Sequence, residues 1–532
     1  MNRGSFAEAK GSPELVKGGC GMIYSLTTAD ELAVLQAHQG DVAQVFGRLE
    51  PGDGVWVYRW DAACTLPANG GTVWGKGDAG RWRLCHDGTV SLRCFGVFGT
   101  ETPADDALEN LIADAQVHTV RVDTDVDFAR RHTFARSNIT LDFTGHRVTA
   151  RRIEPARHND PFGALLHFTG TPVGEEHCFA LREPLREMFD IFEVPEGVDF
   201  PLYSWWRVRV NHLTGGEERE IDKLLCVTEI IDSTHVRVNY KMGWPLEAGR
   251  IMGWQRVQPV ENVCVQGMRF WGNEGDEVTG VQPLAFEYAV RCDVRDVRAW
   301  HTYWPVILRR HNTEYVTERC SLTNPIEVVV GGTGYLTQQI HCLYGSVRDC
   351  TTSNARHLND FTGSAYCMVH NCHGDGDFHG AFVTHGQFEH DLTYVGNSGL
   401  LSFANSGPVW GGSAKRITVI RHSGFWCIGY AKVSDLTLQD VTVCRTTAYD
   451  GVDTGDMGPC GTFLMNADGL QMRGCTGDKL ILTQRSARSV RPVVIRDCWF
   501  RDGIEVVCRG ENAVDPALDI LLEPIKTDQR EG

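Results

Sequence analysis

The sequence lacks the features of several common protein classes. No apolar run approaches the roughly 20 residues of a membrane span, and residues 1–19 have no apolar core of the kind that signal peptides carry. Basic residues are in the minority, because 51 Lys and Arg face 68 Asp and Glu, and the net charge is −17. We therefore expect an acidic protein made in a cytoplasm, with neither a membrane nor a nucleic acid as partner.

Zinc-ligand spacing is also missing, although cysteine is plentiful. The chain has 19 cysteines and no CxxC pair of the zinc-ribbon type. This pattern predicts no metal ion, and no other cofactor is expected. The cysteines need another explanation, and their positions along the chain supply one.

A short sequence motif repeats between Glu261 and Gly510. Branched and polar residues lead to a closing cysteine in YVTERC, SVRDC, CMVHNC, LQMRGC and VVIRDC. The first apolar positions of the copies, 19 to 34 residues apart, are Val265, Val294, Val316, Val347, Met368, Leu392, Ile417, Leu436, Leu470 and Val493. A period of this size without helical periodicity is typical of a coiled parallel β-sheet in which each repeat forms one rung.

The closing cysteines are expected to stack on one another inside the coil. They are Cys320, Cys350, Cys372, Cys475 and Cys498. Free cysteine behaves as a small buried hydrophobe, so we expect these thiols to stay reduced. A metal or redox role is the alternative interpretation.

The 532 residues exceed the size of one hydrophobic core, so several units are expected. Residues 105–115 predict a short helix that closes one end of the coil. The strands and hairpin turns between 154 and 259 do not follow the repeat, which favours an inserted small antiparallel β-barrel. The predicted parts are a head at 1–103, the capping helix and first rungs at 104–153, the barrel at 154–259, the main β-helix at 260–509 and a tail at 510–532.

The stretch that precedes the first rungs resembles a known family. Its motifs are Trp60-Asp61, Gly70 to Val73, Gly80 to Trp82, Asp87 to Val90 and Phe95 to Val97. In this arrangement they resemble the segment that introduces the β-helix in bacteriophage tailspikes and tail-fibre proteins of the pectate-lyase-like superfamily. Residues 99–106, GTETPADD, depart from the glycine-rich loop of that family.

The resemblance implies a fold and a set of partners. The fold is an all-β, right-handed parallel β-helix with an N-terminal domain that attaches to the virion. Central rungs of the same family are similar to residues 379–407. The implied partners are two further copies in a homotrimer, other virion proteins and a polysaccharide of the host surface.

The densest polar cluster lies between residues 370 and 391. Its members are His370, His373, Asp375, Asp377, His379, His385, Glu389, His390 and Asp391. Glycoside hydrolysis needs two carboxyl groups about 5–5.5 Å or about 6.5–9.5 Å apart, so Asp375 or Asp377 with Glu389 or Asp391 are the candidate catalytic pairs. A divalent metal site and a set of hydrogen-bonded turn residues are the alternatives.

Aromatic and basic side chains supply further candidates. Sugar rings are expected to stack on Trp300, Tyr303, Trp304, Trp410 and Trp426, unless these side chains pack against another subunit. A lyase mechanism would need a basic residue, for which Arg309, Arg310 and Arg356 are the candidates. Cysteines outside the repeat are candidates for disulfides between chains after release into an oxidising medium, namely Cys20, Cys64, Cys85, Cys94 and Cys460.

Three functions fit these patterns. The first is a bacteriophage virion appendage, a tailspike or tail fibre, that engages a glycan of the host surface. The second is a polysaccharide depolymerase, acting as an endoglycosidase or a lyase through the carboxylate cluster. The third is a purely structural collar or spacer.

Overall fold

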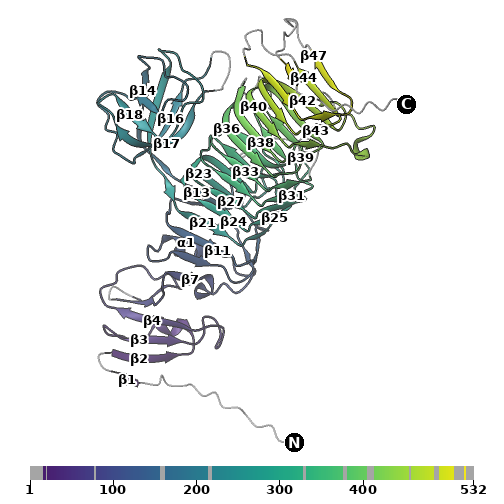
Figure 1. Cartoon of the computed structure of the whole chain (residues 1–532). Coiled ribbons are helices and arrows are strands. Elements are labelled where there is room, and N and C mark those ends of the chain that lie inside the picture. Colours follow the sequence, from purple (N-terminus) through teal and green to yellow (C-terminus); the bar gives the residue numbers. More distant parts are fainter. Residues whose placement is uncertain are drawn as a thin grey trace, which may run out of the picture. The chain divides into compact units, whose positions relative to one another are not determined.

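The computed structural model describes residues 16–18, 21–76, 80–155, 162–213, 219–327, 331–375, 380–403, 413–454, 457–483, 491–507 and 520–522. The chain forms two compact units, of which the first comprises Met1–Ala129 and Ile139–Thr149 and the second Arg130–Asn138 and Ala150–Gly532. Nearly every element is a strand (Figure 1). Within the described residues, no helix is long and apolar enough to cross a membrane.

The first unit joins a small sheet to the first rungs. Its sheet has the order β1 (Val16–Gly18), β2 (Gly21–Leu26), β3 (Val42–Val45), β4 (Trp56–Asp61), β6 (Arg81–Leu84) and β5 (Val73–Trp74). Helix α1 (Asp105–Ala113) buries Leu108 and Leu111 completely, as a capping helix requires. Parallel pairs follow between β7 (Thr89–Ser91), β8 (Thr119–Arg121) and β11 (Ile139–Asp142), and between β9 (Val126–Asp127) and β12 (Arg147–Thr149). The head boundary predicted at residue 103 thus falls inside this unit.

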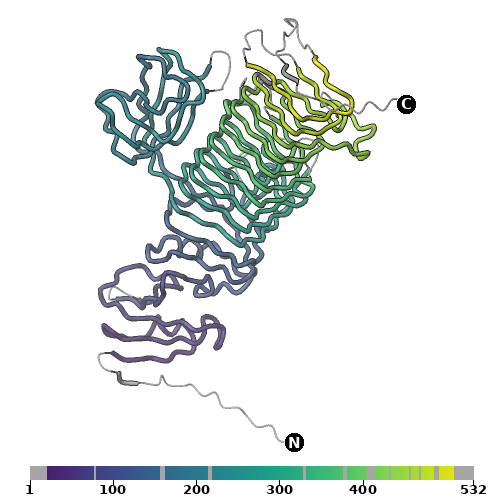
Figure 2. Tube along the Cα trace, viewed as in Figure 1, coloured from purple at the N-terminus to yellow at the C-terminus, as the bar shows by residue number. Residues whose placement is uncertain are grey.

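The second unit contains a parallel β-helix with three strands in each rung. The first face holds β10 (His132–Phe134), β13 (Leu166–Thr169), β23 (Leu284–Val290), β26 (Ile307–Thr313), β29 (Tyr335–Ile340), β32 (His357–Thr362), β35 (Phe382–Thr384), β37 (Leu401–Phe403), β44 (Lys479–Thr483) and β47 (Ile504–Val507). Strands β40 (Trp426–Gln439) and β42 (Thr462–Arg473) run through the first and second faces. Figure 2 shows the repeated turns of the chain.

The other two faces complete each rung. The second face holds β21 (Val263–Gln266), β24 (Asp293–Arg295), β27 (Val316–Glu318), β30 (Ser346–Arg348), β33 (Met368–His370), β36 (Gln387–Val395), β38 (Ser413–Ile420), β45 (Val493–Arg496) and β48 (Ile520–Leu522). Strand β20 (Val260–Glu261) belongs to the first face, because it pairs with the end of β23. The third face holds β22 (Arg269–Trp271), β25 (Arg298–Trp300), β28 (Ser321–Thr323), β31 (Thr351–Ser353), β34 (His373–Gly374), β39 (Ser423–Gly424), β41 (Thr442–Val443), β43 (Thr476–Gly477) and β46 (Trp499–Phe500).

The corner between the second and third faces explains the repeated sequence phrase. One residue per rung turns the chain there with φ between 50° and 66°, and these residues are Asp296, Arg319, Asp349, Asn371, Gly396, Arg421, Asp440, Gly474 and Asp497. Gly, Asn and Asp adopt this left-handed conformation most readily. At these corners the backbone N–H donates a hydrogen bond to a carbonyl oxygen of the next rung, as Asp349 N does to His370 O at 3.1 Å. The local conformation and the stacking therefore reinforce each other.

The residue after each corner points into the core, and the expected cysteine stack is confirmed. Cys320, Cys350, Cys372, Cys475 and Cys498 are unpaired thiols with at most 2% of their surface exposed. Burial raises the pKa of Cys350, which lies between two other thiols. In the rungs between Cys372 and Cys475, this inward position is occupied by Asn397, His422 and Val441. The backbone hydrogen bonds from each rung to the one before show the equivalence.

The register corrects part of the predicted repeat. Val265 pairs with Val294 as expected, but the next inward positions are Thr317 and Val369 rather than Val316 and Met368. A shift by one residue exchanges the inward and outward sides of a strand, so a weakly apolar strand leaves the register open. The later anchors pair as predicted from Leu392 to Val493.

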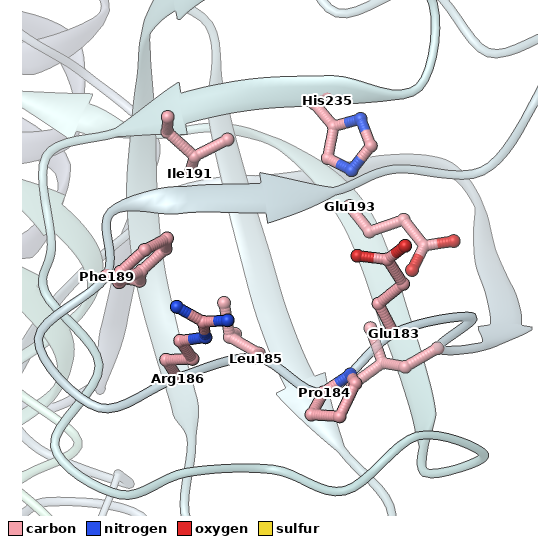
Figure 3. Close-up of a pocket in the computed structure, with 9 residues that line it drawn as sticks. Glu183, Pro184, Leu185, Arg186, Phe189, Ile191, Glu193 and His235 are labelled. Atoms are coloured by element: carbon pink, nitrogen blue, oxygen red, sulfur yellow. The ribbon is translucent and has the colours of Figure 1, made fainter.

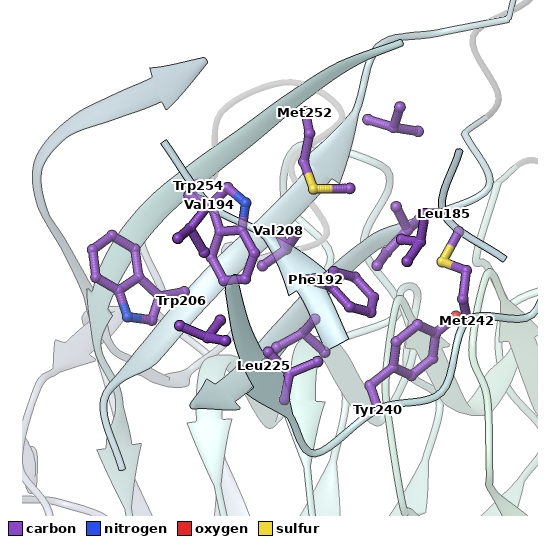
Figure 4. Close-up of a cluster of buried hydrophobic side chains, with 14 of the residues drawn as sticks. Leu185, Phe192, Val194, Trp206, Val208, Leu225, Tyr240, Met242, Met252 and Trp254 are labelled. Carbon is purple, nitrogen blue, oxygen red and sulfur yellow. The ribbon is translucent and has the colours of Figure 1, made fainter. Parts of the chain in front are cut away.

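Residues 171–258 form an antiparallel domain inserted into the β-helix. Its strand order is β14 (Thr171–Ala180), β19 (Ile251–Gln258), β16 (Trp205–Val210), β17 (Asp222–Ile230), β18 (His235–Val238) and β15 (Ile191–Glu193). Inward residues of these strands share a core around Phe192, Trp206 and Trp254 (Figure 4). Trp206 and Trp254 pack edge to face at 6.2 Å, a favourable aromatic geometry.

Disulfide formation between chains is now expected at one cysteine above all. Cys64, Cys94 and Cys460 are unpaired and buried within the chain, whereas Cys85 is exposed. Cys20 lies outside the described residues. Because a disulfide needs Cα atoms within about 7 Å, a second copy can approach Cys85 more easily than the other described candidates. We expect non-reducing electrophoresis of alkylated native protein to show a dimer that Cys85→Ser removes; a dimer that persists in this variant would contradict the assignment.

Candidate functional site

The candidate site begins with one outward position on the first face. In β32, Asn359 points into the core, where Gln339 donates a hydrogen bond to it. Phe361 also packs inside, against Tyr394. Because side chains alternate along a strand, Asp360 between them points outward. Asp360 is nonetheless fully buried, so neighbouring groups cover its carboxylate.

The carboxylate of Asp360 is held by three side chains. His385 Nε2 lies 3.1 Å from Oδ2, and Gln338 Nε2 donates to the same oxygen at 3.3 Å. Thr362 Oγ1 donates to Oδ1 at 3.4 Å. These residues come from β29, β32 and the turn after β35, so three consecutive rungs build the site.

His385 has the protonation behaviour of an acid–base group. Burial acts against its charged form, but the negative charge and hydrogen bond of Asp360 outweigh burial, and the pKa of His385 is raised above its ordinary value. The side chain of His385 is 16% exposed. A partly exposed imidazolium paired with a buried carboxylate can donate a proton to a bound molecule.

Arg356 is the predicted basic residue whose charge acts on this site. Burial and the positive charge of Arg356 both act against protonation of His385. The guanidinium lies 5.2 Å from the centroid of Tyr335 and donates to Gly331 O at 2.8 Å. Of the other two candidates, Arg309 is fully buried in the core and Arg310 pairs with Glu287.

Glu389, a predicted catalytic residue, is fully buried beside this site. Its Oε1 accepts hydrogen bonds from Gly363 N at 3.0 Å and Gln387 N at 3.1 Å. Burial raises the pKa of Glu389, although these bonds and the charge of His385 act in the opposite direction. Its Oε2 has no hydrogen-bond partner among the described residues. Glu389 is thus a buried acid electrostatically linked to His385.

The other predicted carboxylates are held elsewhere. Asp375 is exposed after β34 and accepts from Ser353 Oγ and Asn354 N, each at 3.1 Å. Asp391 binds His390 and Arg416; burial opposes ionisation, but these bonds lower the pKa of Asp391 to about 2. Asp377 and His379 lie outside the described residues. Asp375, Glu389 and Asp391 therefore occupy three separate networks.

The remaining histidines of the cluster also separate. His390 is fully buried beneath the inserted domain, with Nε2 2.7 Å from Tyr240 Oη, and burial lowers the pKa of His390 to about 4. His370 and His373 are exposed, and His373 Nδ1 lies 2.8 Å from Ser398 Oγ. Within the described part of the chain, no group of three or more His, Cys, Asp or Glu side chains has an arrangement suited to a metal ion.

Most of the predicted sugar-binding aromatics are buried. Tyr303, Trp304 and Trp426 expose at most 6% of their surface, and Trp410 lies outside the described residues. Trp300 differs, because it is partly exposed on β25 and stacks on Trp271 of the rung before at 4.1 Å and 17°. Phe270 and Ala299 fill the core, so both tryptophans face outward.

Two parts of these sites were missed in the sequence. Asp360 lies in HLNDFT, whose residues are all buried and show no alternation of apolar and polar side chains. Trp271 stands 29 positions before Trp300, within the range of the repeat spacing, so alignment of the two rungs would have revealed the pair.

No protein-family model matches the chain, and no curated protein matches its sequence. Among solved structures, the tailspike gp61 of Pseudomonas phage phi297 is similar with a TM-score of 0.53 and 11% identity, over 83% of this chain and 77% of that chain. The Gp54 tailspike of Acinetobacter baumannii bacteriophage AP22 aligns with a TM-score of 0.49 and 10% identity, over 81% and 79% of the two chains. The family 28 exopolygalacturonase of Yersinia enterocolitica aligns with a TM-score of 0.42 and 11% identity, over 92% and 84%. The chain is therefore a right-handed parallel β-helix with the fold of the phi297 tailspike.

Proposed function

We propose that this chain is a bacteriophage tail appendage whose β-helix binds a polysaccharide of the host surface. The observation that carries the proposal is the outward-facing polar site around Asp360 and His385 on a β-helix of tailspike fold. The partly exposed Trp271–Trp300 stack on the third face adds an apolar platform of the kind on which sugar rings pack.

The proposal includes an assembly and a location. The head attaches to other virion proteins, and three copies associate through faces of the β-helix. The motifs from Trp60 to Val97, which resemble the start of tailspike β-helices, support this part. Light scattering should give the mass of a trimer, and a stable monomer at micromolar concentration would contradict it.

Trp300 provides the first test of glycan binding. Capsule, exopolysaccharide and lipopolysaccharide from candidate hosts are titrated against the full chain by calorimetry. Trp300→Ala should weaken binding about 3- to 10-fold, because an aromatic stacking contact is worth about 0.5–1.5 kcal/mol. Trp300→Phe retains a ring and should bind nearly as tightly as the native protein. Equal affinities of the native protein and Trp300→Ala would remove the tryptophan stack from the binding surface.

Cleavage of the bound polysaccharide is the second candidate function. It is favoured by one observation, the raised pKa of a partly exposed His385 that is paired with buried Asp360. In hydrolysis the protonated imidazole donates its proton to the departing glycosidic oxygen as that bond breaks, water adds to the sugar carbon, and the proton released by the water returns the imidazole to its charged form. In this proposal Arg356, whose positive charge acts on His385, binds an acidic sugar. In this proposal the reacting bond lies on the first face.

A further inference from the structure

We propose that the inserted domain carries a second saccharide site, a pocket for a neutral sugar ring. The pocket has a volume of about 400 Å³ and lies between the segment 181–193 and β18. Figure 3 shows Phe189 and Arg186 along one side and the carboxylates of Glu183 and Glu193 along the other. The inference rests on the proposed binding of a host polysaccharide, and it adds a site away from Asp360 and Trp300.

The wall of this pocket is fixed by backbone hydrogen bonds to residues 242–250. Leu181 N donates to Arg250 O at 2.9 Å, and Leu185 exchanges two bonds with Leu246, at 3.0 and 2.8 Å. Met242 N donates to Phe189 O at 2.9 Å. A wall tied at three points is already in place before a ligand arrives, which reduces the entropy lost on binding.

The apolar lining suits the C–H face of a sugar. Leu181 and Leu185 are buried at the base, with 3% and 7% of their surface exposed. Phe189 is 46% exposed, so part of its ring is accessible to a ligand. Arg186 lies 5.7 Å from the centre of this ring and leaves part of the ring open to the pocket.

The polar lining favours a neutral ligand over a strongly charged one. Glu193 is already neutralised, because Arg182 donates to it through its backbone N at 2.9 Å and through its guanidinium. The side chains of Glu183 and Arg186 have no hydrogen bond or ion pair with another described residue, so one acceptor and one donor of opposite charge remain for ligand hydroxyls. Their charges cancel, and no excess charge of one sign selects an acidic or a basic ligand.

The pocket is also connected to the β-helix. Glu187, within the same wall segment, forms an ion pair with Lys415 at 3.0 Å and another with Arg416, both from β38. Arg416 in turn binds Asp391 at 2.8 Å. These contacts lie within one unit and fix the wall of the pocket against the second face. A polymer bound in the pocket is therefore held at a set position relative to the rungs.

Ligand-detected NMR on the full chain tests the pocket. The probes are the methyl glycosides of glucose, galactose and N-acetylglucosamine at millimolar concentration. At least one should receive saturation from the native protein, and Phe189→Ala should reduce this transfer at least threefold. Phe189→Leu, which retains apolar bulk but has no ring, should also reduce it. Tyr203→Ala is the matched control, because Tyr203 is a 74% exposed aromatic on the same domain and outside the pocket.

Each result decides the inference separately from polysaccharide binding by the β-helix. Loss of transfer in Phe189→Ala with retention in Tyr203→Ala supports a separate pocket. Transfer that survives Phe189→Ala but disappears in Trp300→Ala overturns the pocket and assigns the sugar to the third face. If no probe receives saturation, the pocket is also overturned, while the titration of polysaccharide against Trp300→Ala still decides the proposed function.

Discussion

Replacing His385 with glutamine should slow polysaccharide cleavage by about 10²- to 10⁴-fold, the usual contribution of a general acid or base. Glutamine retains a polar group that can hydrogen-bond Asp360, but it cannot donate a proton to a leaving oxygen. Binding of the polysaccharide should change much less than the cleavage rate, because the imidazole acts mainly in the transition state. The measurement is the rate at which new reducing ends or unsaturated ends form.

The pH profile separates proton transfer from a structural role of His385. Asp360 raises the pKa of His385, so the histidine stays protonated to a higher pH than an isolated imidazole. In Asp360→Asn the alkaline limb of the cleavage rate should therefore move to lower pH. His373→Gln is the matched control, since His373 is exposed and bonded to Ser398, and its rate should be native. A native rate in His385→Gln would contradict the assignment.

Replacing Asp222 with asparagine should loosen the inserted domain from the β-helix. Asp222 on β17 is 6% exposed and is held by Arg207 at 2.8 and 2.6 Å. His311 of β26 lies 2.9 Å away through Nε2, so the pair joins the two parts of the unit. Burial acts against the charge, but the interactions with His311 and Arg207 hold the pKa of Asp222 well below its usual range.

The expected cost of this change is about 3–5 kcal/mol, because a largely buried ion pair loses its carboxylate. It should appear as a lower first unfolding transition and as faster proteolytic release of residues near 171–258. Asp232→Asn is the control on the same domain, because Asp232 is 55% exposed and its loss should cost less than about 1 kcal/mol. Equal effects of the two substitutions would show that the ion pair with Arg207 does not hold the domain in place.

The repeat was predictable from the sequence because its signals are adjacent residues. Each corner residue and the cysteine after it are adjacent, so pairs such as Asp349-Cys350 and Asp497-Cys498 indicate both the turn and the inward position. The register of β27 was harder to predict, because the adjacent residues Val316 and Thr317 have similar size and either could point inward. Pairing with the strands of the adjacent rungs decides which of the two residues points inward, and the sequence of one strand does not contain this information.

The site around Asp360 depends on contacts between rungs. Gln338, Asp360 and His385 are 22 and 25 residues apart, and only parallel pairing of three rungs brings them together. The sequence cluster at 370–391 included His385 and Glu389 but mixed them with Asp375 and Asp391, which lie on other parts of the rung. The hydrogen bond between Asp222 and His311 spans 89 residues and has no local sequence signal.

Adsorption to host cells tests the central claim most directly. The full chain is mixed with bacteria of a candidate host that carry or lack their surface polysaccharide, and the fraction that sediments with the cells is measured. The account predicts adsorption only to cells that carry the polysaccharide, competition by the purified polymer, and weaker adsorption of Trp300→Ala. Equal adsorption to both kinds of cells, with no competition by the polymer, would contradict the account.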